Sequence, residues 1–262
     1  MKITLFTSNQ RRHNYLINVL SRICEKLFVI QEDSKTPDEI VPVNYTSSKN
    51  ISNYFEKVDF AQKKVFYNYD IKNFKDKVKI FNILSGNLNE ISLKKMNDFF
   101  KSDIYVVFGS SYIRNELVDF LIKKKAINIH MGISPFYRGT DCNFWALFDG
   151  NPHLVGSTVH LLSKGLDSGP ILYHALSNIK TDPFEYTMSS VKSAFHSIAK
   201  RINDNSILKI QPLVQDNSKE IRYSQKKDFN DKIVNEFFEK KIDLNSKNFD
   251  HSFLKDPYFL DS

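Results

Sequence analysis

Short apolar runs alternate with amphipathic segments along the first two thirds of the chain. Runs of about four to eight apolar residues are typical of strands, and apolar residues three or four apart are typical of helices. The strands predicted in this way span residues 2–7, 26–31, 77–84, 104–108, 126–129 and 157–162. The predicted helices span residues 12–23, 54–67, 93–101, 114–123 and 144–148, and residues 32–53 form a polar, turn-rich segment. This alternation predicts an α/β fold whose open, mostly parallel sheet is covered by helices on both faces.

The last third of the chain has a different pattern. Two further helices are predicted over residues 182–203 and 228–240, and the first of them begins at an Asp-Pro pair, a favourable helix start. From Lys219 onwards the chain carries nine basic and nine acidic residues. We therefore expect a main domain over residues 1–214 and a short C-terminal appendage over residues 215–262 that packs on it.

Composition and charge narrow the class of protein. The net charge is +7, but the 37 basic residues divide into 30 Lys and 7 Arg. Arg is the better reader of bases and phosphates, whereas scattered Lys is typical of a solvated surface, so nucleic-acid binding is disfavoured. No apolar run approaches the roughly 20 residues that a membrane span requires. Cys24 and Cys142 lie far apart and are expected to be free thiols in a reducing compartment, which predicts a cytoplasmic protein.

Three polar residues in the central third of the chain form a candidate catalytic set. Asn128 and His130 stand two apart on a predicted strand and therefore project from one face. Asp167 lies in a turn between Gly165 and Gly169. Together the three supply a neutral donor, a group that titrates near neutral pH and a charge that can tune it. His130 alone would be more typical of a core histidine, and Asp167 alone is equally consistent with turn chemistry.

The surrounding sequence resembles the family of formyltransferases that use 10-formyltetrahydrofolate. The family pattern is N-x-H, then P-x-x-x-G, then a D-x-G turn further on. The corresponding segments here are 128–130, 135–139 and 167–169, in the same order. The resemblance is strong over residues 103–173 and implies a Rossmann-like formyltransferase fold, with the catalytic domain over residues 1–214 and 10-formyltetrahydrofolate as the co-substrate.

The resemblance also implies a role for each candidate. Formyl transfer to an amine passes through a tetrahedral intermediate with a developing oxyanion. Asn128 would donate a hydrogen bond to that oxygen, and His130 would stabilise it, accept the surplus proton of the amine, or do both in succession. Asp167 would orient His130 or a water, and would raise the proton affinity of the imidazole by charge proximity.

Folate recognition in this family is mostly through backbone groups and leaves little side-chain signature. The matching positions are expected to bind the co-substrate here: Gly109, Ser111, Ile113, Arg114, Leu162, Ser163 and Gly165. Ser111 and its neighbour Ser110 have an alternative interpretation as caps of the next helix.

The turn after the first predicted strand is the expected substrate site. Ser8 and Asn9 resemble a Ser-Asn pair of the family that can hold a substrate phosphate at a helix N-terminus. With Arg11 and Arg138 they form the predicted substrate-binding set. A helix N-cap is an equally good interpretation of the Ser-Asn pair, and the glycine-rich lead-in of the purine-pathway members is absent.

Other chemistries are disfavoured. The sequence has no P-loop and no G-x-G-x-x-G motif, which disfavours ATP and nicotinamide cofactors. The remaining histidines show no metal-ligand spacing with one another, so no metal is expected. Trp145 and His160 are interpreted as structural residues.

The acceptor class is predicted from the appendage and from one loop. Methionyl-tRNA formyltransferases add a basic C-terminal domain for the tRNA, whereas the appendage here is short and neutral. The loop after His130 resembles sugar-nucleotide N-formyltransferases of the GDP-perosamine type, which implies lipopolysaccharide O-antigen chemistry. We therefore expect the acceptor to be a dideoxyamino sugar carried by GDP or dTDP, and a homodimer is one expected assembly. A methionyl-tRNA formyltransferase-like enzyme, another folate-dependent formyltransferase and a catalytically silent binding protein are the alternatives.

Overall fold

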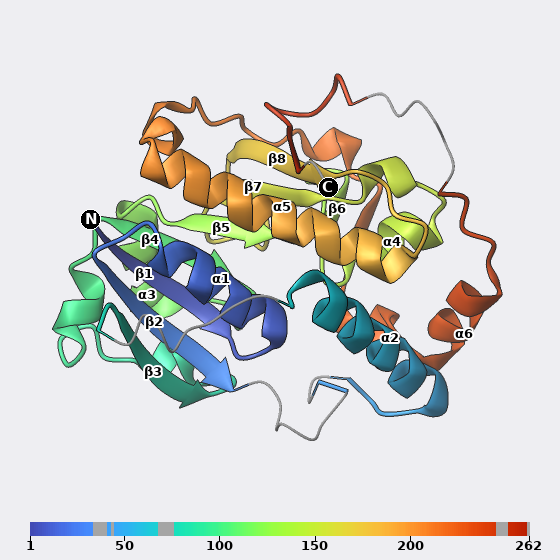
Figure 1. Ribbon diagram of the computed structural model, residues 1–262, viewed down its shortest axis with the longest axis horizontal. Coiled ribbons are helices and arrows are strands. Elements are labelled where there is room, and N and C mark those ends of the chain that lie inside the picture. Colours follow the sequence, from blue (N-terminus) through green and yellow to red (C-terminus); the bar gives the residue numbers. More distant parts are fainter. Residues whose placement is uncertain (34–40, 43–44, 68–75, 245–250, 261–262) are drawn as a thin grey trace.

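The computed structural model describes residues 1–33, 41–42, 45–67, 76–244 and 251–260. Its centre is an eight-stranded sheet with the order β10-β8-β7-β5-β4-β1-β2-β3 (Figure 1). These strands are β1 (Lys2–Ser8), β2 (Lys26–Asp33), β3 (Val78–Leu84), β4 (Ile104–Phe108), β5 (Ile127–His130), β7 (Ser157–Leu161), β8 (Ile171–Ser177) and β10 (Tyr258–Leu260). Neighbouring strands are parallel except at β5–β7 and β7–β8. The predicted open, mostly parallel α/β sheet is therefore confirmed.

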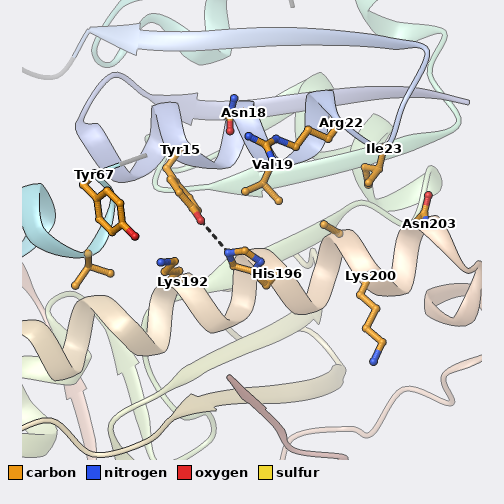
Figure 2. Close-up of a pocket in the computed structure, with 12 residues that line it drawn as sticks. Tyr15, Asn18, Val19, Arg22, Ile23, Tyr67, Lys192, His196, Lys200 and Asn203 are labelled. Carbon is orange, nitrogen blue, oxygen red and sulfur yellow. Dashed lines mark hydrogen bonds between the residues drawn. The ribbon is translucent and has the colours of Figure 1, made fainter. Parts of the chain in front are cut away.

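Helices cover both faces of this sheet. They are α1 (Arg11–Ser21), α2 (Lys49–Val65), α3 (Asn115–Lys123), α4 (Cys142–Phe148), α5 (Pro183–Asn203) and α6 (Asp231–Glu239). Short 3-10 helices span Asn87–Glu90, Asn97–Phe100, Pro152–Leu154, Ser206–Lys209, Asn217–Lys219 and Lys226–Asp228. Helices α1 and α5 cross one face, with α3 behind the sheet (Figure 1), and the Tyr15 hydroxyl of α1 lies 2.9 Å from Nε2 of His196 of α5 (Figure 2).

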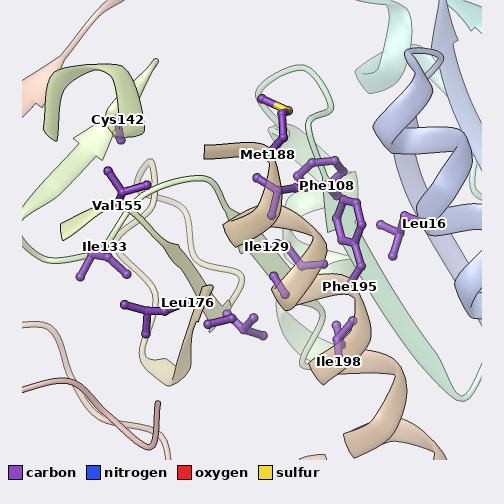
Figure 3. Packing of buried hydrophobic residues seen from close by; sticks show 14 of the residues in the cluster. Leu16, Phe108, Ile129, Ile133, Cys142, Val155, Leu176, Met188, Phe195 and Ile198 are labelled. Atoms are coloured by element: carbon purple, nitrogen blue, oxygen red, sulfur yellow. The ribbon is translucent and has the colours of Figure 1, made fainter. Parts of the chain in front are cut away.

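Successive residues of the central strands pack into two different cores. Leu5 and Phe108 belong to the cluster that includes α1 and α5, whereas Phe6 and Val107 belong to the cluster that includes α3. Phe108 meets Phe195 of α5 with ring centroids 4.8 Å apart (Figure 3). The period-two alternation of a strand buried on both faces therefore fixes which helices each strand supports.

The helix predicted over residues 93–101 is wrong. Asn97–Phe100 is a single 3-10 turn. The carbonyl oxygen of Phe99 accepts a 2.5 Å hydrogen bond from the Thr4 hydroxyl, and that of Phe100 accepts a 2.7 Å bond from the Tyr105 hydroxyl. These side-chain bonds tie the turn to the central strands β1 and β4, and the rings of Phe99 and Phe100 are buried.

Two further elements differ from the predictions. The helix predicted from residue 54 begins at Lys49, because the Ser48 side chain caps it by accepting a hydrogen bond from Ile51 N at 3.2 Å. Strand β8 was not predicted, since all of its residues are buried and the alternation of polar and apolar positions is absent. Residues 34–40 and 43–44 of the predicted turn-rich segment lie outside the described residues.

The C-terminal residues pair with the rest of the chain at two places. β10 adds to the sheet in parallel beside β8, and a small second sheet joins β6 (Tyr137–Gly139) to β9 (Arg222–Ser224). The backbone N–H of Lys255 donates to Nδ1 of His174 at 3.0 Å, and Nε2 of His174 lies 2.9 Å from the carbonyl oxygen of Ser134. These contacts hold the appendage against β8, while the division of the chain at residue 214 stays a prediction.

Candidate active site

A cavity of about 760 Å³ opens at the carboxyl ends of β1, β4 and β5. Ligands of open α/β sheets bind at this edge, and the volume is within the roughly 300–1,000 Å³ of small-molecule sites. Ser8 at the end of β1, Gly109 after β4 and Asn128 of β5 line it, as do Thr187 and Met188 of α5.

The structure brings Asn128, His130 and Asp167 together in this cavity. His130 Nδ1 lies 3.3 Å from Asp167 Oδ2, and Asn128 Nδ2 donates to Asp167 Oδ1 at 3.5 Å. His130 is 6% exposed and Asp167 is 9% exposed. A polar set this deeply buried and mutually paired is suited to reaction chemistry, while the role of each residue stays a prediction.

His160 joins the three residues, although the sequence favoured a purely structural role for it. Its Nδ1 lies 2.8 Å from the carbonyl oxygen of Leu161, so a neutral ring carries its hydrogen there. Nε2 is then an acceptor for the Asn128 amide at 2.9 Å. One amide hydrogen of Asn128 is thereby fixed, and the other, which makes only the long contact with Asp167, is available to an oxygen in the cavity. We call Asn128, His130, His160 and Asp167 the floor of the site.

The turn that carries Asp167 is held by its backbone. Asp167 has φ 49°, a left-handed conformation that Asp tolerates. The side-chain amide of Gln215 donates to the carbonyl oxygens of Asp167 and Gly169 at 2.7 and 2.8 Å. A Cβ on Gly169 would lie 1.7 Å from the carbonyl oxygen of Leu161, so this turn requires glycine to approach β7. The D-x-G pattern therefore reflects packing as well as charge.

The electrostatics of the floor favour a neutral imidazole beside an ionised carboxylate. Burial lowers the pKa of His130 and outweighs the raising effect of Asp167, so the net direction is opposite to that expected from charge proximity alone. Burial would raise the pKa of Asp167, but His130 and His160 outweigh it and the pKa lies below its ordinary value. The ionised carboxylate holds the hydrogen of His130 at Nδ1, which leaves Nε2 as the basic nitrogen.

Most of the predicted co-substrate residues line the cavity. They are Gly109, Ser111, Ile113, Leu162, Ser163 and Gly165. Arg114 is not among the lining residues: it is exposed, and its backbone N–H donates to Asn89 Oδ1 at 2.7 Å. The hydroxyl of Tyr112, in the loop after β4, donates to the carbonyl oxygen of Lys164, in the loop after β7. This hydrogen bond joins the two loops.

Glu32 at the end of β2 was missed by the sequence analysis. Its carboxylate accepts hydrogen bonds from Ser111 N at 2.5 Å and from Gly86 N at 2.9 Å, and the residue is 2% exposed. A buried carboxylate bonded to two backbone donors fixes the loop after β4. No local motif signals this role, because Glu32 follows an ordinary apolar strand.

The predicted substrate set is divided by the structure. Ser8 lines the cavity, whereas Asn9, Arg11 and Arg138 do not. Asn9 Nδ2 donates to Asp33 Oδ1 at 3.2 Å. Arg138 donates to Glu220, to Asn217 and to the carbonyl oxygen of Leu166, at 3.0, 3.2 and 3.2 Å. Arg138 therefore braces the turn before Asp167 from outside the cavity.

Arg12, next to the predicted Arg11, is the basic side chain that lines the cavity at the start of α1. Its Nε is buried and makes no hydrogen bond to any described residue. Burial lowers its pKa to about 10, against the raising effects of Tyr45 and Asp141. Arg12 therefore remains a cation at neutral pH and can receive an anionic group.

Aromatic side chains from α2, α4 and residue 45 form another part of the cavity lining. They are Tyr45, Tyr54, Phe55 and Phe144, and we call these four residues the wall. Tyr54 and Phe144 have ring centroids 5.5 Å apart, and Tyr45 and Phe55 have centroids 5.0 Å apart. The Tyr45 hydroxyl donates to Asp141 Oδ1 at 2.8 Å, so one end of the wall carries a polar group.

Among the described residues, no group of three or more His, Cys, Asp or Glu side chains is placed to hold a metal ion. None of the described helices has the length and apolar character that crossing a membrane requires.

Comparison with known proteins identifies the class. The model of the formyl transferase family matches residues 73–205, about half of the sequence. The chain therefore belongs to the formyl transferase family.

Curated relatives match over short segments. A methionyl-tRNA formyltransferase of Thermodesulfovibrio yellowstonii is 33% identical over 97 residues, which cover 37% of this chain and 30% of that protein. The bifunctional polymyxin resistance protein ArnA of Wigglesworthia glossinidia brevipalpis is 30% identical over 115 residues, or 44% of this chain and 17% of that protein. The chain thus matches less than a third of the length of these relatives.

Solved structures extend the likeness to most of the chain. An N-formyltransferase of Helicobacter canadensis, solved with folinic acid and dTDP-3-aminofucose, has a TM-score of 0.54 at 14% identity and covers 88% of this chain and 73% of its own. Glycinamide ribonucleotide transformylase 1 of Symbiobacterium toebii has a TM-score of 0.53 at 14% identity and covers 82% and 94%. At these identities the likeness is one of fold.

Proposed function

We propose that this protein is an N-formyltransferase that moves a formyl group from 10-formyltetrahydrofolate to the amino group of a nucleotide-linked dideoxyamino sugar. The observation that carries the proposal is the floor: Asn128, His130 and Asp167 converge in one cavity, at the strand edge where an open α/β sheet binds ligands. Membership of the formyl transferase family supports the reaction class.

The floor can serve each step of this reaction. The amine nitrogen attacks the formyl carbon, and the carbonyl oxygen becomes an oxyanion that accepts a hydrogen bond from the second amide hydrogen of Asn128. The new C–N bond leaves a surplus proton on the amine. Nε2 of His130 takes that proton, and Asp167 stabilises the imidazolium. Collapse of the intermediate breaks the bond to the folate nitrogen, which receives the proton held by the His130 imidazolium as it leaves, so that His130 becomes neutral again.

The base must move to act. Nε2 of His130 lies 3.1 Å from the carbonyl oxygen of Tyr137, which cannot donate to an unprotonated nitrogen. A neutral His130 with its hydrogen at Nδ1 therefore gains by turning Nε2 towards an amine in the cavity.

The loops after β4 and β7 supply the expected place for the folate. They meet through Tyr112 and Lys164, and Glu32 fixes the first of them. The solved Helicobacter canadensis enzyme of the same fold holds folinic acid, which supports a folate co-substrate here. Recognition by these loops would rest on backbone groups, in agreement with the uncharged side chains of Gly109, Ser111, Ile113, Leu162, Ser163 and Gly165.

The wall and Arg12 favour a nucleotide sugar as the acceptor. Aromatic rings provide flat surfaces for a base or a sugar, and a buried Arg can hold a diphosphate. The Helicobacter canadensis enzyme binds dTDP-3-aminofucose. The proposed acceptor would place its diphosphate at Ser8 and Arg12 and its amino group at His130.

A direct assay tests the acceptor. The full chain is incubated with 10-formyltetrahydrofolate and, in parallel, with GDP- and dTDP-linked amino sugars and with initiator methionyl-tRNA, and N-formyl product is measured. We expect turnover of at least one sugar nucleotide and competitive inhibition by its nucleoside diphosphate alone, because the diphosphate supplies binding energy remote from the reacting nitrogen.

A methionyl-tRNA formyltransferase-like enzyme is the second candidate, because most of the curated relatives that match carry that activity in their names. Efficient formylation of the tRNA with no sugar nucleotide turned over would favour it. Folate binding without any turnover would instead favour a catalytically silent protein.

A further inference from the structure

A second cavity, of about 430 Å³, lies between α1, the end of α2 and α5 (Figure 2). Among the residues that the structure describes, none lines both this cavity and the active-site cavity. Tyr15 and Asn18 of α1 form its inner side and are 7% and 2% exposed, and the Tyr15 hydroxyl meets Nε2 of His196 at 2.9 Å. The proposed formyl transfer makes no use of this cavity.

Two cations approach the Tyr15–His196 pair from opposite helices. Figure 2 shows the side chain of Arg22 lying back along α1, and Lys192 on α5 beside Tyr15 and Tyr67. Lys192 Nζ is 5.6 Å from the centroid of the Tyr15 ring and 5.9 Å from that of Tyr67. Within the described parts of the chain, neither cation forms an ion pair with a carboxylate, and no acidic side chain lines the cavity.

The electrostatic effects of the two cations converge. Burial, Lys192 and Arg22 all lower the pKa of His196. Arg22 also acts on the Tyr15 hydroxyl, whose pKa burial raises. Lys200 lines the same cavity but differs, because its ammonium group lies 6.0 Å from the ring centroid of Tyr258. Arg22 and Lys192 therefore both act on the Tyr15–His196 pair.

We propose that this cavity binds a small organic phosphate, with the phosphoryl group between Arg22 and Lys192 and the organic part against Tyr15 and Tyr67. A phosphate monoester carries close to two negative charges at neutral pH and so matches two cations. A guanidinium can bond two phosphoryl oxygens at once, and an ammonium adds a point charge. The volume suits a ligand no larger than a nucleoside monophosphate.

The position of the cavity gives such a ligand a structural effect. The first turn of α1 carries Arg12 and the second turn of α5 carries Thr187, and both residues line the active-site cavity. The second cavity lies between later turns of the same two helices. A bound phosphate would therefore hold together the helices that shape the active site.

Calorimetric titration of the full chain at low ionic strength tests this site. The probes are adenosine monophosphate and inorganic phosphate. We expect saturable binding of both, with adenosine monophosphate the tighter because only it contacts the tyrosine rings. Arg22→Gln and Lys192→Gln should each weaken binding about tenfold or more, since each removes a charge-assisted contact. Lys200→Gln is the matched control on α5 and should stay within about twofold of wild type.

A further variant separates the two cavities. Arg12→Gln removes the buried arginine of the active-site cavity and should leave this binding in place. Thermal melting of each variant checks that it is folded. Loss of binding in Arg12→Gln with no change in Arg22→Gln would assign the anion to the active-site cavity and overturn the proposal. Absence of saturable binding to the wild type would overturn the site. Equal affinity for adenosine monophosphate and inorganic phosphate would overturn the placement of the organic group against Tyr15 and Tyr67.

Discussion

The floor and the wall of the active-site cavity are built in opposite ways. The floor takes its polar side chains from β5, from β7 and from the turn before β8, and they are joined to one another by contacts of 2.9 to 3.8 Å. The wall takes rings from α2 and α4 and from residue 45, and these rings meet mostly edge to face. One region is directional and polar, and the other is apolar and adaptable.

This difference indicates that one part of the cavity serves the reaction and another part serves discrimination between acceptors. Hydrogen bonds fix the orientation of groups that must act on a reacting centre within narrow limits. Aromatic surfaces discriminate by shape and tolerate small shifts. Changes in the floor should therefore reduce turnover, and changes in the wall should alter the KM for the acceptor.

The largest effect is expected on removing a floor side chain that contacts the reacting atoms. His130→Ala and Asn128→Ala should each reduce turnover at least about 10²-fold, because the base or the oxyanion donor is lost. Steady-state kinetics and a melting curve measure the two effects separately. Asn82→Ala, at an exposed position of β3, is the control and should keep wild-type turnover. Near wild-type turnover in either floor variant would remove that residue from the mechanism.

Asp167→Asn should reduce turnover about tenfold or more and shift the pH profile. Asn tolerates the left-handed backbone of this position, so the charge is removed without changing the turn. Asp167 raises the pKa of His130, and without it the pKa falls further. The acid limb of the rate profile should therefore move to lower pH. A full rate with an unchanged profile would leave Asp167 as a turn residue only.

His160 should act through Asn128. His160→Leu removes the acceptor that holds the amide and is expected to lower kcat about tenfold with little change in the acceptor KM. His160→Gln retains an acceptor oxygen and should recover part of the loss. Equal loss in both variants would point to a packing role, because residue 160 is 1% exposed.

The wall should give a smaller effect of a different kind. Tyr45→Phe removes the hydrogen bond to Asp141 and should raise the KM for the acceptor roughly fivefold, with kcat within about twofold of wild type. Tyr258→Phe, on β10, is the matched control. A fall in kcat without a change in KM would contradict the division between floor and wall.

His174 should affect stability and leave turnover at neutral pH unchanged. Burial lowers its pKa from 6.5 to about 4, and the neutral ring satisfies both Ser134 and Lys255. The unfolded chain takes up a proton below its ordinary pKa and the folded chain does not, so stability falls as the pH decreases from about 6.5 to 4. His174 accounts for roughly 3 kcal/mol of the unfolding free energy that is lost over this pH range. Urea unfolding of His174→Gln should show a shallower pH dependence, and an identical slope would contradict this assignment.

Features that depend on residues close together in the sequence could be predicted from it. The alternation of apolar runs and amphipathic segments predicted the sheet, and the two-residue spacing placed Asn128 and His130 on one face. The first helix was predicted from residue 12, whereas α1 begins at Arg11. Successive side chains on a helix point in directions about 100° apart, so neighbouring residues face different surroundings. This is why Arg12, and not Arg11, lines the cavity.

Features that depend on distant residues could not be predicted. Asn128 pairs with His160 because β5 and β7 are antiparallel with this register, which a mostly parallel pattern does not indicate. Glu32 reaches Ser111 only after β2 and β4 are placed on either side of β1. In each case the missing information was strand order and register, which single-sequence periodicity does not contain.

The position of β5 inside the sheet has a consequence for how the molecule opens. β5 lies between β4 and β7, and β3 and β10 lie at the two edges. Amide hydrogen exchange should therefore be slowest at the central strands and fastest at the edges, because internal strands open only in larger unfolding events. Strand β5, which carries Asn128 and His130, has hydrogen-bonded neighbours on both sides, so the reacting side chains stand on a part of the sheet that should exchange slowly.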